Sequence, residues 1–325
     1  MAETFHVLGG IDEAGLGPLL GPLVVAGLVL AGKQGESPWD ALADAFCKKR
    51  ASRRDRRIRV DDSKLVKTGK HGHRELERTA LALLHATTGS IPKNVAELLA
   101  LGVGTRNLTH YPWYKNAAEI PLPRYQDRAS LELDVHVGAR AFAKAGVSCL
   151  AYPFRVVDVS TFNSLIRKHD NKGIMLFDAT VPVMKACVLA AHEARSTQWT
   201  DATTTLVIDR HGGRSHYRGL LQRAFPSTRI EIVEETTRVS RYHLGEHTEI
   251  LFAENGESRA FPTAAGSCLA KYVREVLVER INDWFLARRP GLKRTAGYYT
   301  DGRRFLADVA DLAAELPRDL LVRIR

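Results

Sequence analysis

Apolar residues along the chain fall into short clusters of two kinds, which predict a protein of strands and helices. Brief apolar runs bounded by glycine, proline or charged residues indicate strands, and apolar positions that repeat every three to four residues indicate helices. Strands are expected at about residues 5–11, 23–30, 149–157, 203–208, 229–233 and 249–253. Helices are expected at about residues 74–85, 127–145, 161–168, 179–194, 217–225 and 264–285.

This mixture of strands and helices predicts the α/β class. Residues 87–125 have weak periodicity and many Gly, Pro and polar positions, so we expect an irregular insertion at about residues 90–150. A helical tail is expected at about residues 286–325. The chain of 325 residues is therefore expected to form one large domain, residues 1–325, that carries both additions.

The four cysteines, Cys47, Cys149, Cys187 and Cys268, form no CxxC pair. Neither a zinc ribbon nor a disulfide framework is indicated, and a reduced cytoplasm suits them. The most apolar run, residues 19–31, is interrupted by Gly and Pro and is shorter than the roughly 20 residues of a membrane span. Without the pattern of a signal peptide at the N-terminus, we expect a cytoplasmic protein with no membrane contact.

The charge balance narrows the class of partner. Lys and Arg outnumber Asp and Glu by 47 to 37, which gives a formal net charge of +10. Such an excess favours a polyanionic partner such as nucleic acid or a membrane surface. Residues 48–59 hold eight of these cations, although their composition fits a solvated loop equally well.

Two predicted strands end in a carboxylate. Asp12 and Asp209 each follow a buried run, and a glycine follows each within three residues. Ligands of α/β sheets bind beyond strand ends, so two such ends can converge on one site. Because neighbouring side chains on a strand point to opposite faces, Asp12 and Glu13 are expected to share a metal only if the strand ends there.

A further carboxylate comes from the predicted helix at residues 264–285. Ser267, Lys271 and Glu275 are spaced four residues apart and therefore lie on one stripe of that helix. Four carboxylates around Mg²⁺ or Mn²⁺ are what in-line hydrolysis of a phosphodiester requires. Each acid also has an ordinary alternative, since an Asp after a strand often forms a turn or a helix cap and a helical Glu often forms a surface ion pair.

Several motifs, in order along the chain, resemble the type 2 ribonucleases H, the HII family and its HIII relatives. The longest is GIDEAGLGPLLGPLVV at residues 10–25. It is followed by DSKL at 62–65, FN at 162–163 with the helix after it, AAGSCLAKYVRE at 264–275 and GYYT at 297–300. The resemblance spans most of the chain apart from roughly residues 90–150.

The resemblance implies a ribonuclease H-like fold, a mixed central sheet of about five strands flanked by helices. It implies that metal-binding, catalytic acids hold Mg²⁺ or Mn²⁺, that two lysines position the phosphate, and that a glycine loop and one of two tyrosines contact the nucleic acid. The acids are Asp12, Glu13, Asp209 and Glu275, and the substrate-binding residues are Gly15, Leu16, Gly17, Lys64, Lys271, Tyr298 and Tyr299.

Three departures from the family pattern limit what the resemblance implies about the substrate. Leu16 stands where ribonucleases HII carry an Arg, so the charged fork that contacts the ribonucleotide is missing. Glu275 stands where an Asp is usual. Asp209 is followed by Arg210 and not directly by a glycine.

The implied function is a monomeric metal-dependent endonuclease that cuts RNA in RNA–DNA hybrids or at ribonucleotides in duplex DNA. Water is the nucleophile, and the products carry a 3′-hydroxyl and a 5′-phosphate. One alternative is a nuclease of the same fold with another nucleic-acid substrate, and another is a non-catalytic nucleic-acid-binding module. In each case we expect a basic segment beside the substrate channel, made of Lys48, Lys49, Arg50, Arg53, Arg54, Arg56, Arg57 and Arg59.

Overall fold

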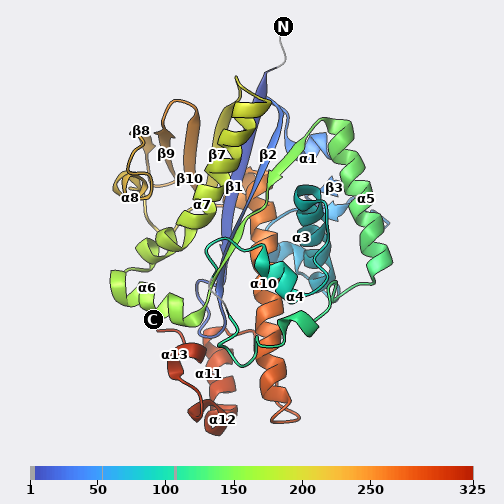
Figure 1. Cartoon of the computed structure of the whole chain (residues 1–325), viewed down its shortest axis with the longest axis vertical. Helices are drawn as coiled ribbons and strands as arrows, with labels where there is room; N and C mark the ends of the chain where they lie inside the picture. The colour runs from blue at the N-terminus through green and yellow to red at the C-terminus, as the bar shows by residue number, and fades with distance from the viewer. Residues whose placement is uncertain (1–3, 53, 106–107, 325) are drawn as a thin grey trace.

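The computed structural model describes residues 4–52, 54–105 and 108–324. Among these residues, the largest sheet has eight strands of mixed direction, in the order β5-β2-β1-β7-β10-β9-β8, with β6 also paired to β2 (Figure 1). Its strands are β1 (Phe5–Ala14), β2 (Leu23–Lys33), β5 (Ser148–Ala151), β6 (Phe154–Val157), β7 (Thr203–Asp209), β8 (Ile230–Glu235), β9 (Val239–Leu244) and β10 (Thr248–Ala253). A separate short pair consists of β3 (Phe46–Cys47) and β4 (Ile58–Arg59).

Helices cover both faces of the large sheet, so the predicted α/β class with a mixed sheet flanked by helices is confirmed (Figure 1). The helices before β7 are α1 (Pro38–Ala41), α2 (Ser63–Val66), α3 (Gly72–Thr88), α4 (Val95–Ala100), the 3₁₀ turn η1 (Ala117–Glu119), α5 (Arg128–Ala145), α6 (Val159–His169) and α7 (Lys172–Thr197). Those after β7 are α8 (Arg218–Ala224), α9 (Gly256–Arg259), α10 (Phe261–Leu286), α11 (Tyr299–Asp308), α12 (Ala310–Ala314) and α13 (Arg318–Leu321).

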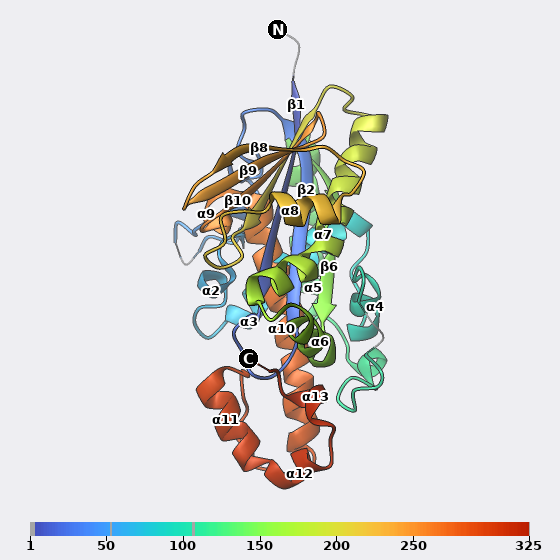
Figure 2. The ribbon, with the colours of Figure 1, turned by 90° about the vertical axis from the view of Figure 1, so that its left-hand side faces the viewer.

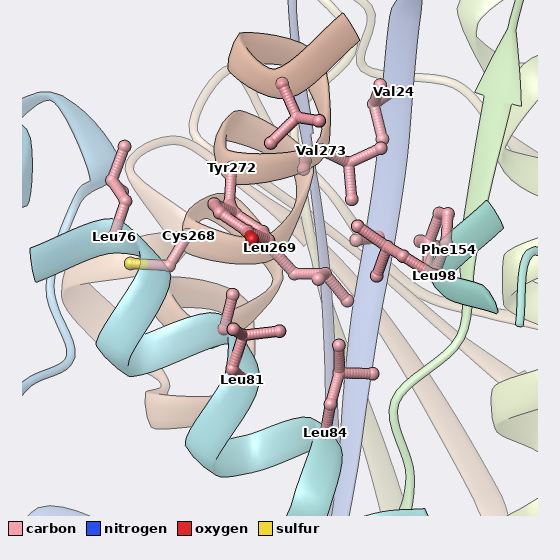
Figure 3. Close-up of a cluster of buried hydrophobic side chains, with 14 of the residues drawn as sticks. Val24, Leu76, Leu81, Leu84, Leu98, Phe154, Cys268, Leu269, Tyr272 and Val273 are labelled. Atoms are coloured by element: carbon pink, nitrogen blue, oxygen red, sulfur yellow. The ribbon is translucent and has the colours of Figure 1, made fainter. Parts of the chain in front are cut away.

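Strand β2 separates two hydrophobic cores because its side chains alternate between the faces of the sheet. Val24 and Leu28 belong to the core under α3, α5 and α10, part of which Figure 3 shows. Val25 and Val29 belong to the core under α6, α7 and α8. With both faces covered, β2 reads as a continuous apolar run, which is how the sequence identified it.

Helix α7 is long and apolar enough to cross a membrane by length and composition alone. Half of its apolar window is nevertheless buried inside the protein, where Met175, Phe177 and Met184 pack into the second core. The apolar side chains of α7 therefore cover one face of the sheet.

Three neighbouring strands share one direction and so bring the predicted acids to one edge of the sheet. Strand β1 pairs in parallel with β7, and Ile11 lies opposite Ile208. Strand β10 pairs in parallel with β7 on its other side, with Ala253 opposite Asp209. The residues that follow these positions in the three strands therefore emerge next to one another.

Two glycines let α10 lie directly on the strands that carry the acids. A Cβ atom on Gly10 would lie 2.2 Å from the backbone nitrogen of Thr263, and one on Gly266 would lie 2.6 Å from the carbonyl oxygen of Ala26. Real Cβ atoms do not approach so closely, so only glycine permits this packing. The close approach brings the next residue of α10, Ser267, to the end of β1.

Several expectations about the elements were wrong in detail. The large sheet has eight strands among the described residues and not the roughly five that the resemblance implied. Compared with the six strands expected from the apolar pattern, β9 was missed and residues 149–157 form two strands, β5 and β6. Strand β1 does not end before Asp12 but continues to Ala14, because its pairing with β2 extends to Val24.

The region expected to be irregular contains two short helical elements, α4 and η1, that the sequence did not predict, whereas a helix at 127–145 and a helical tail were expected. Residues 90–150 include α4, η1 and α5, and α5 packs on α3. The tail contains α11, α12 and α13, which lie beyond the end of the sheet and beside the last turns of α10 (Figure 2). Arg325, at its end, lies outside the described residues.

Candidate functional site

The acidic pocket is a cavity of about 230 Å³ at the ends of β1 and β7. Asp12, Glu13 and Asp209 each offer a carboxylate oxygen, and these oxygens all lie within 4.8 Å of one another. The three acids predicted from the two strand ends are therefore brought together by the fold.

Asp12 and Glu13 meet although both lie inside a strand, contrary to the expectation that the strand must end there. The backbone N–H of Glu13 donates a hydrogen bond of 2.7 Å to Oδ1 of Asp12, which holds the Asp12 carboxylate against the backbone of the next residue. Asp209 is held on the other side by the backbone N–H of Gly256, which donates to its Oδ1 at 3.0 Å. The first turn of α9 thus fixes the third acid.

Burial and mutual repulsion make these acids retain protons in the absence of a cation. Burial, followed by the charges of Glu13 and Asp209, raises the pKa of Asp12 well above its usual value. Burial and the charge of Asp209 raise the pKa of Glu13 to about 8. Burial also raises the pKa of Asp209. A divalent cation would replace those protons and remove the repulsion.

The donor set fits a hard divalent cation. All three groups are carboxylates, and oxygen ligands of Mg²⁺ and Ca²⁺ lie about 2.0 to 2.6 Å from the ion, so one ion can bridge oxygens up to about 5 Å apart. The separation of less than 4.8 Å between the three carboxylates meets this requirement.

Glu275, the fourth predicted acid, does not join this group. Its carboxylate lies 2.7 Å from Nζ of Lys67 and 2.8 Å from Nζ of Lys271, and it does not line the acidic pocket. Burial would raise the pKa of Glu275, but the two ammonium groups outweigh it and hold the pKa at about 2. On the stripe of α10, Ser267 faces the acids, whereas Glu275, two turns further along, meets the lysines.

Glu257, which the sequence analysis missed, supplies a fourth carboxylate to the pocket. It lies on α9, four residues after the end of β10, and lines the pocket beside Asp209. Burial raises the pKa of Glu257, and the charges of Asp209 and Asp62 raise it further. The signal was weaker than at the other two strands, because the acid directly after residues 249–253 is Glu254 and Glu257 comes three residues later.

Both predicted lysines line the acidic pocket. Lys64 lies on α2 and is largely exposed, and its ammonium is 3.9 Å from the carboxylate of Asp62. Lys271 is largely buried and is fixed by Glu275. Its ammonium also lies 5.9 Å from the ring centre of Tyr298. The pocket therefore presents two cations next to its acids.

The predicted tyrosines differ in position. Tyr298 lines the pocket and is half exposed, so its ring is available to a ligand. Tyr299 starts α11 and does not line the pocket, and its ring lies 5.7 Å from the guanidinium of Arg303.

The glycine loop lines the pocket through Gly15, Leu16 and Gly17. Gly15 has a φ of +92°, and a Cβ atom there would lie 2.6 Å from Cδ of Arg274, so this position requires glycine. Leu16 is half buried and packs against the core under α7. No guanidinium replaces its missing charge from within the loop.

Two buried arginines brace the backbone of this loop. Arg274 donates hydrogen bonds to the carbonyl oxygens of Pro22 and Leu20, at 2.6 and 3.2 Å. Arg323, near the C-terminus, donates to the carbonyl oxygen of Gly15. The shape of the loop thus depends on residues from distant parts of the chain.

The cations of the basic segment at residues 48–59 lie in several different surroundings. Lys49, Arg50, Arg56 and Arg59 line a second pocket, whereas Arg57 pairs with Asp55 at 2.7 Å. Lys48 donates to the carbonyl oxygen of Ser258 in α9, Arg54 is exposed, and Arg53 lies outside the described residues.

Comparison with known proteins gives structural similarity alone. No family model and no curated protein matches the sequence. Type 2 ribonucleases H are among the solved structures that the chain resembles. Ribonuclease HII of Archaeoglobus fulgidus, in its complex with PCNA, is 14% identical, with 98% of this chain and 94% of that chain covered and a TM-score of 0.45. Ribonuclease H2 of Pyrococcus horikoshii is 13% identical, with coverage of 97% and 92% and a TM-score of 0.45.

A third similar structure is Bst-RNase HIII in complex with Mn²⁺. It is 14% identical, with 98% of this chain and 66% of that chain covered and a TM-score of 0.41. The three proteins are type 2 ribonucleases H, the proteins whose motifs the sequence resembles.

Proposed function

We propose that the chain is a divalent-metal-dependent endonuclease that hydrolyses phosphodiester bonds of RNA, in RNA–DNA hybrids or at ribonucleotides in duplex DNA. The observation that carries this proposal is the convergence of Asp12, Glu13 and Asp209 within 4.8 Å, in a pocket that also presents lysines. Three carboxylates with raised pKa values are costly to assemble, and cation binding offsets that cost.

In this proposal Asp12, Glu13 and Asp209 hold Mg²⁺ or Mn²⁺, and Glu257 completes the acidic wall. When bound there, such an ion would supply positive charge for activating the attacking water and stabilising the leaving oxygen. Gly256 keeps Asp209 in place through its N–H. Ser267 hydrogen-bonds the Asp12 carboxylate and is itself tied to Ser63 by a hydrogen bond of 2.9 Å, which holds α10 against α2.

The remaining residues of the pocket would bind and orient the substrate. Lys271, fixed by Glu275, and Lys64 provide cations for the phosphate next to the acids. The exposed ring of Tyr298 would contact the sugar or base beside the bond that is cut. Because Gly15 and Gly17 have no side chains, the backbone of their loop can closely approach the nucleic-acid strand.

The RNA-directed part of this proposal rests on the sequence motifs, and Leu16 bears on it. Without an arginine in the glycine loop, recognition of one embedded ribonucleotide loses a charged hydrogen bond. We therefore favour substrates in which several consecutive 2′-hydroxyls or the shape of a hybrid supply recognition.

The test offers four labelled substrates in parallel: an RNA–DNA hybrid, a duplex with one ribonucleotide, duplex DNA and single-stranded RNA, each with Mg²⁺ or Mn²⁺. We expect cleavage of the hybrid, with products that carry a 3′-hydroxyl and a 5′-phosphate. Asp12→Asn should lower the rate by about a hundredfold to a thousandfold, the equivalent of several kcal/mol, and leave binding of the hybrid intact. Equal rates for Asp12→Asn and the parent would refute the assignment of the acids.

A further inference from the structure

A second pocket, larger than the acidic pocket, adjoins it across α2. We call it the basic pocket; it is a cavity of about 1040 Å³. Ser63 and Lys64 of α2 line the acidic pocket, whereas Leu65 and Val66 of the same helix line the basic pocket. One helical turn therefore separates the two cavities.

Cations outnumber carboxylates in the wall of the basic pocket. Seven Lys and Arg residues line it, against four Asp and Glu. The deepest carboxylate, Glu75, is shared by several guanidinium groups, with 2.5 Å to Arg50, 3.3 Å to Arg78 and 3.6 Å to Arg74. Asp134 also pairs with Arg78, at 2.6 Å, so two carboxylates face these three guanidinium groups and the floor of the pocket stays positive.

The rim of the basic pocket carries cations without a partner. The side chains of Lys49, Arg56 and Lys70 are exposed and form no ion pair or hydrogen bond with any residue that the structure describes. Lys70 stands just before α3, whose first turn has no side-chain cap. The partial positive charge of that helix start adds to the field in the pocket.

The kind of ligand follows from the shape and the lining. The lining cations come from residues 49–59, from Lys70 and from α3, and the cavity of about 1040 Å³ is much larger than one small anion needs, which suits a chain of phosphates better. No Phe, Tyr or Trp side chain lines the pocket within the described residues, and the imidazole of His71 is the one ring in its wall, so there is no platform on which successive bases could stack. Contacts there would be to the backbone and independent of sequence.

We propose that the basic pocket binds backbone phosphates of the same nucleic acid that is cut in the acidic pocket, at nucleotides away from the scissile bond. This inference rests on the proposed function. The basic pocket contributes affinity and register to long substrates, and a short substrate that occupies only the acidic pocket gains nothing from it.

The test replaces the three rim cations together, Lys49→Ala, Arg56→Ala and Lys70→Ala. The matched control is Lys115→Ala, Arg140→Ala and Lys168→Ala, which removes the same charges from exposed positions that do not line the basic pocket. Binding of a long and a short labelled RNA–DNA hybrid is measured by fluorescence anisotropy over a range of salt concentrations with EDTA present.

For the long hybrid, we expect the rim variant to flatten the log–log salt dependence by about two to three units, close to one unit for each phosphate that the protein no longer neutralises. The control should change it by less than about one unit. With metal, the rim variant should raise KM for the long hybrid with little change in kcat, and should leave the short hybrid unaffected.

Equal salt slopes for the rim variant and the control would overturn the inference, and so would an equal decrease in affinity for the long and short hybrids. Because binding is measured without metal, the proposed function fails separately. If the parent cuts none of the nucleic acids offered and the difference in slope remains, the endonuclease proposal is wrong and the basic pocket stands as a nucleic-acid-binding site.

Discussion

Glu275 lies one helical turn beyond Lys271 on α10, and its carboxylate is 2.8 Å from the lysine ammonium. A second lysine, Lys67, approaches the same carboxylate from the segment after α2 at 2.7 Å. Glu275 therefore orients a cation of the acidic pocket without facing the other acids. Glu257, on α9, does face them.

The first prediction separates these two glutamates. Glu257→Gln should weaken binding of Mn²⁺ by at least about tenfold, because it removes a charge from the wall that faces the ion. Glu275→Gln should leave Mn²⁺ binding almost unchanged and lower the free energy of unfolding by up to about 3 kcal/mol, because it leaves two lysines without their partner. Calorimetric titration with Mn²⁺ and urea unfolding measure the two effects. The reverse pattern, with metal binding abolished only in Glu275→Gln, would restore Glu275 as a ligand.

The second prediction concerns pH. The folded protein raises the pKa of Glu13 to about 8, above its value of 4.5 in the unfolded chain. The stability that this protonated group contributes is complete below pH 4.5 and is lost as the pH rises through about 8. The Tm of the metal-free protein should therefore fall between about pH 4.5 and 8, and it should fall less in Glu13→Gln.

Metal should reverse this trend. At about pH 6.5 an incoming cation must displace protons, whereas at about pH 8.5 fewer are bound, so Mn²⁺ should raise the Tm more at the higher pH. Thermal melts with EDTA and with Mn²⁺ at both values check this. Identical pH profiles for the parent and Glu13→Gln without metal would show that Glu13 is not the group that titrates.

The third prediction concerns Leu16. Leu16→Arg should add one charged hydrogen bond to a phosphate or ribose and should improve cleavage of a duplex with a single ribonucleotide by roughly tenfold to a hundredfold, relative to a long hybrid. The rates on both substrates are compared at fixed salt. If the parent already cuts both equally well and the substitution changes neither rate, Leu16 does not determine specificity.

The fourth prediction concerns the contact between α10 and the sheet. Gly266→Ala should lower the free energy of unfolding by about 1 to 3 kcal/mol, because its Cβ atom would lie 2.6 Å from the carbonyl oxygen of Ala26. Gly219→Ala in α8 meets no atom within 4 Å and serves as the control, where helix propensity should raise stability by up to about 1 kcal/mol. Equal denaturation midpoints for the two variants would contradict the close packing.

The strands that carry the site could be predicted because both faces of the sheet are covered. Central strands such as β1 and β7 then form apolar runs that end at polar residues, and the carboxylates Asp12 and Asp209 mark those ends. Glu257 was missed because it does not follow β10 directly: residues 254–256 lie between them, and Glu257 is on the short helix α9. Glu275 was placed wrongly because the spacing along a helix says which stripe a residue shares, and not how far along the helix the site extends.

Other features could not be predicted from local patterns. Residues 149–157 are apolar almost throughout, and only the pairing of β5 and β6 with different parts of β2 divides them at Pro153. The basic pocket depends on the packing of α2, α3 and α5 around residues 49–59, which are far apart in sequence. Charge alone identified the segment, and tertiary structure decided which of its cations face the pocket.

The parallel pairing of β1 with β7 also has a consequence for the synthesis of the chain. Strand β1 can pair with β2 as soon as both have left the ribosome, but its other edge must wait for residues 203–209, which are synthesised much later. Until then a central apolar strand has an open row of backbone hydrogen-bonding groups, which is the kind of edge that recruits other chains. Nascent or truncated chains that stop before β7 should therefore aggregate and depend on chaperones, whereas chains that extend past β10 close the sheet on themselves.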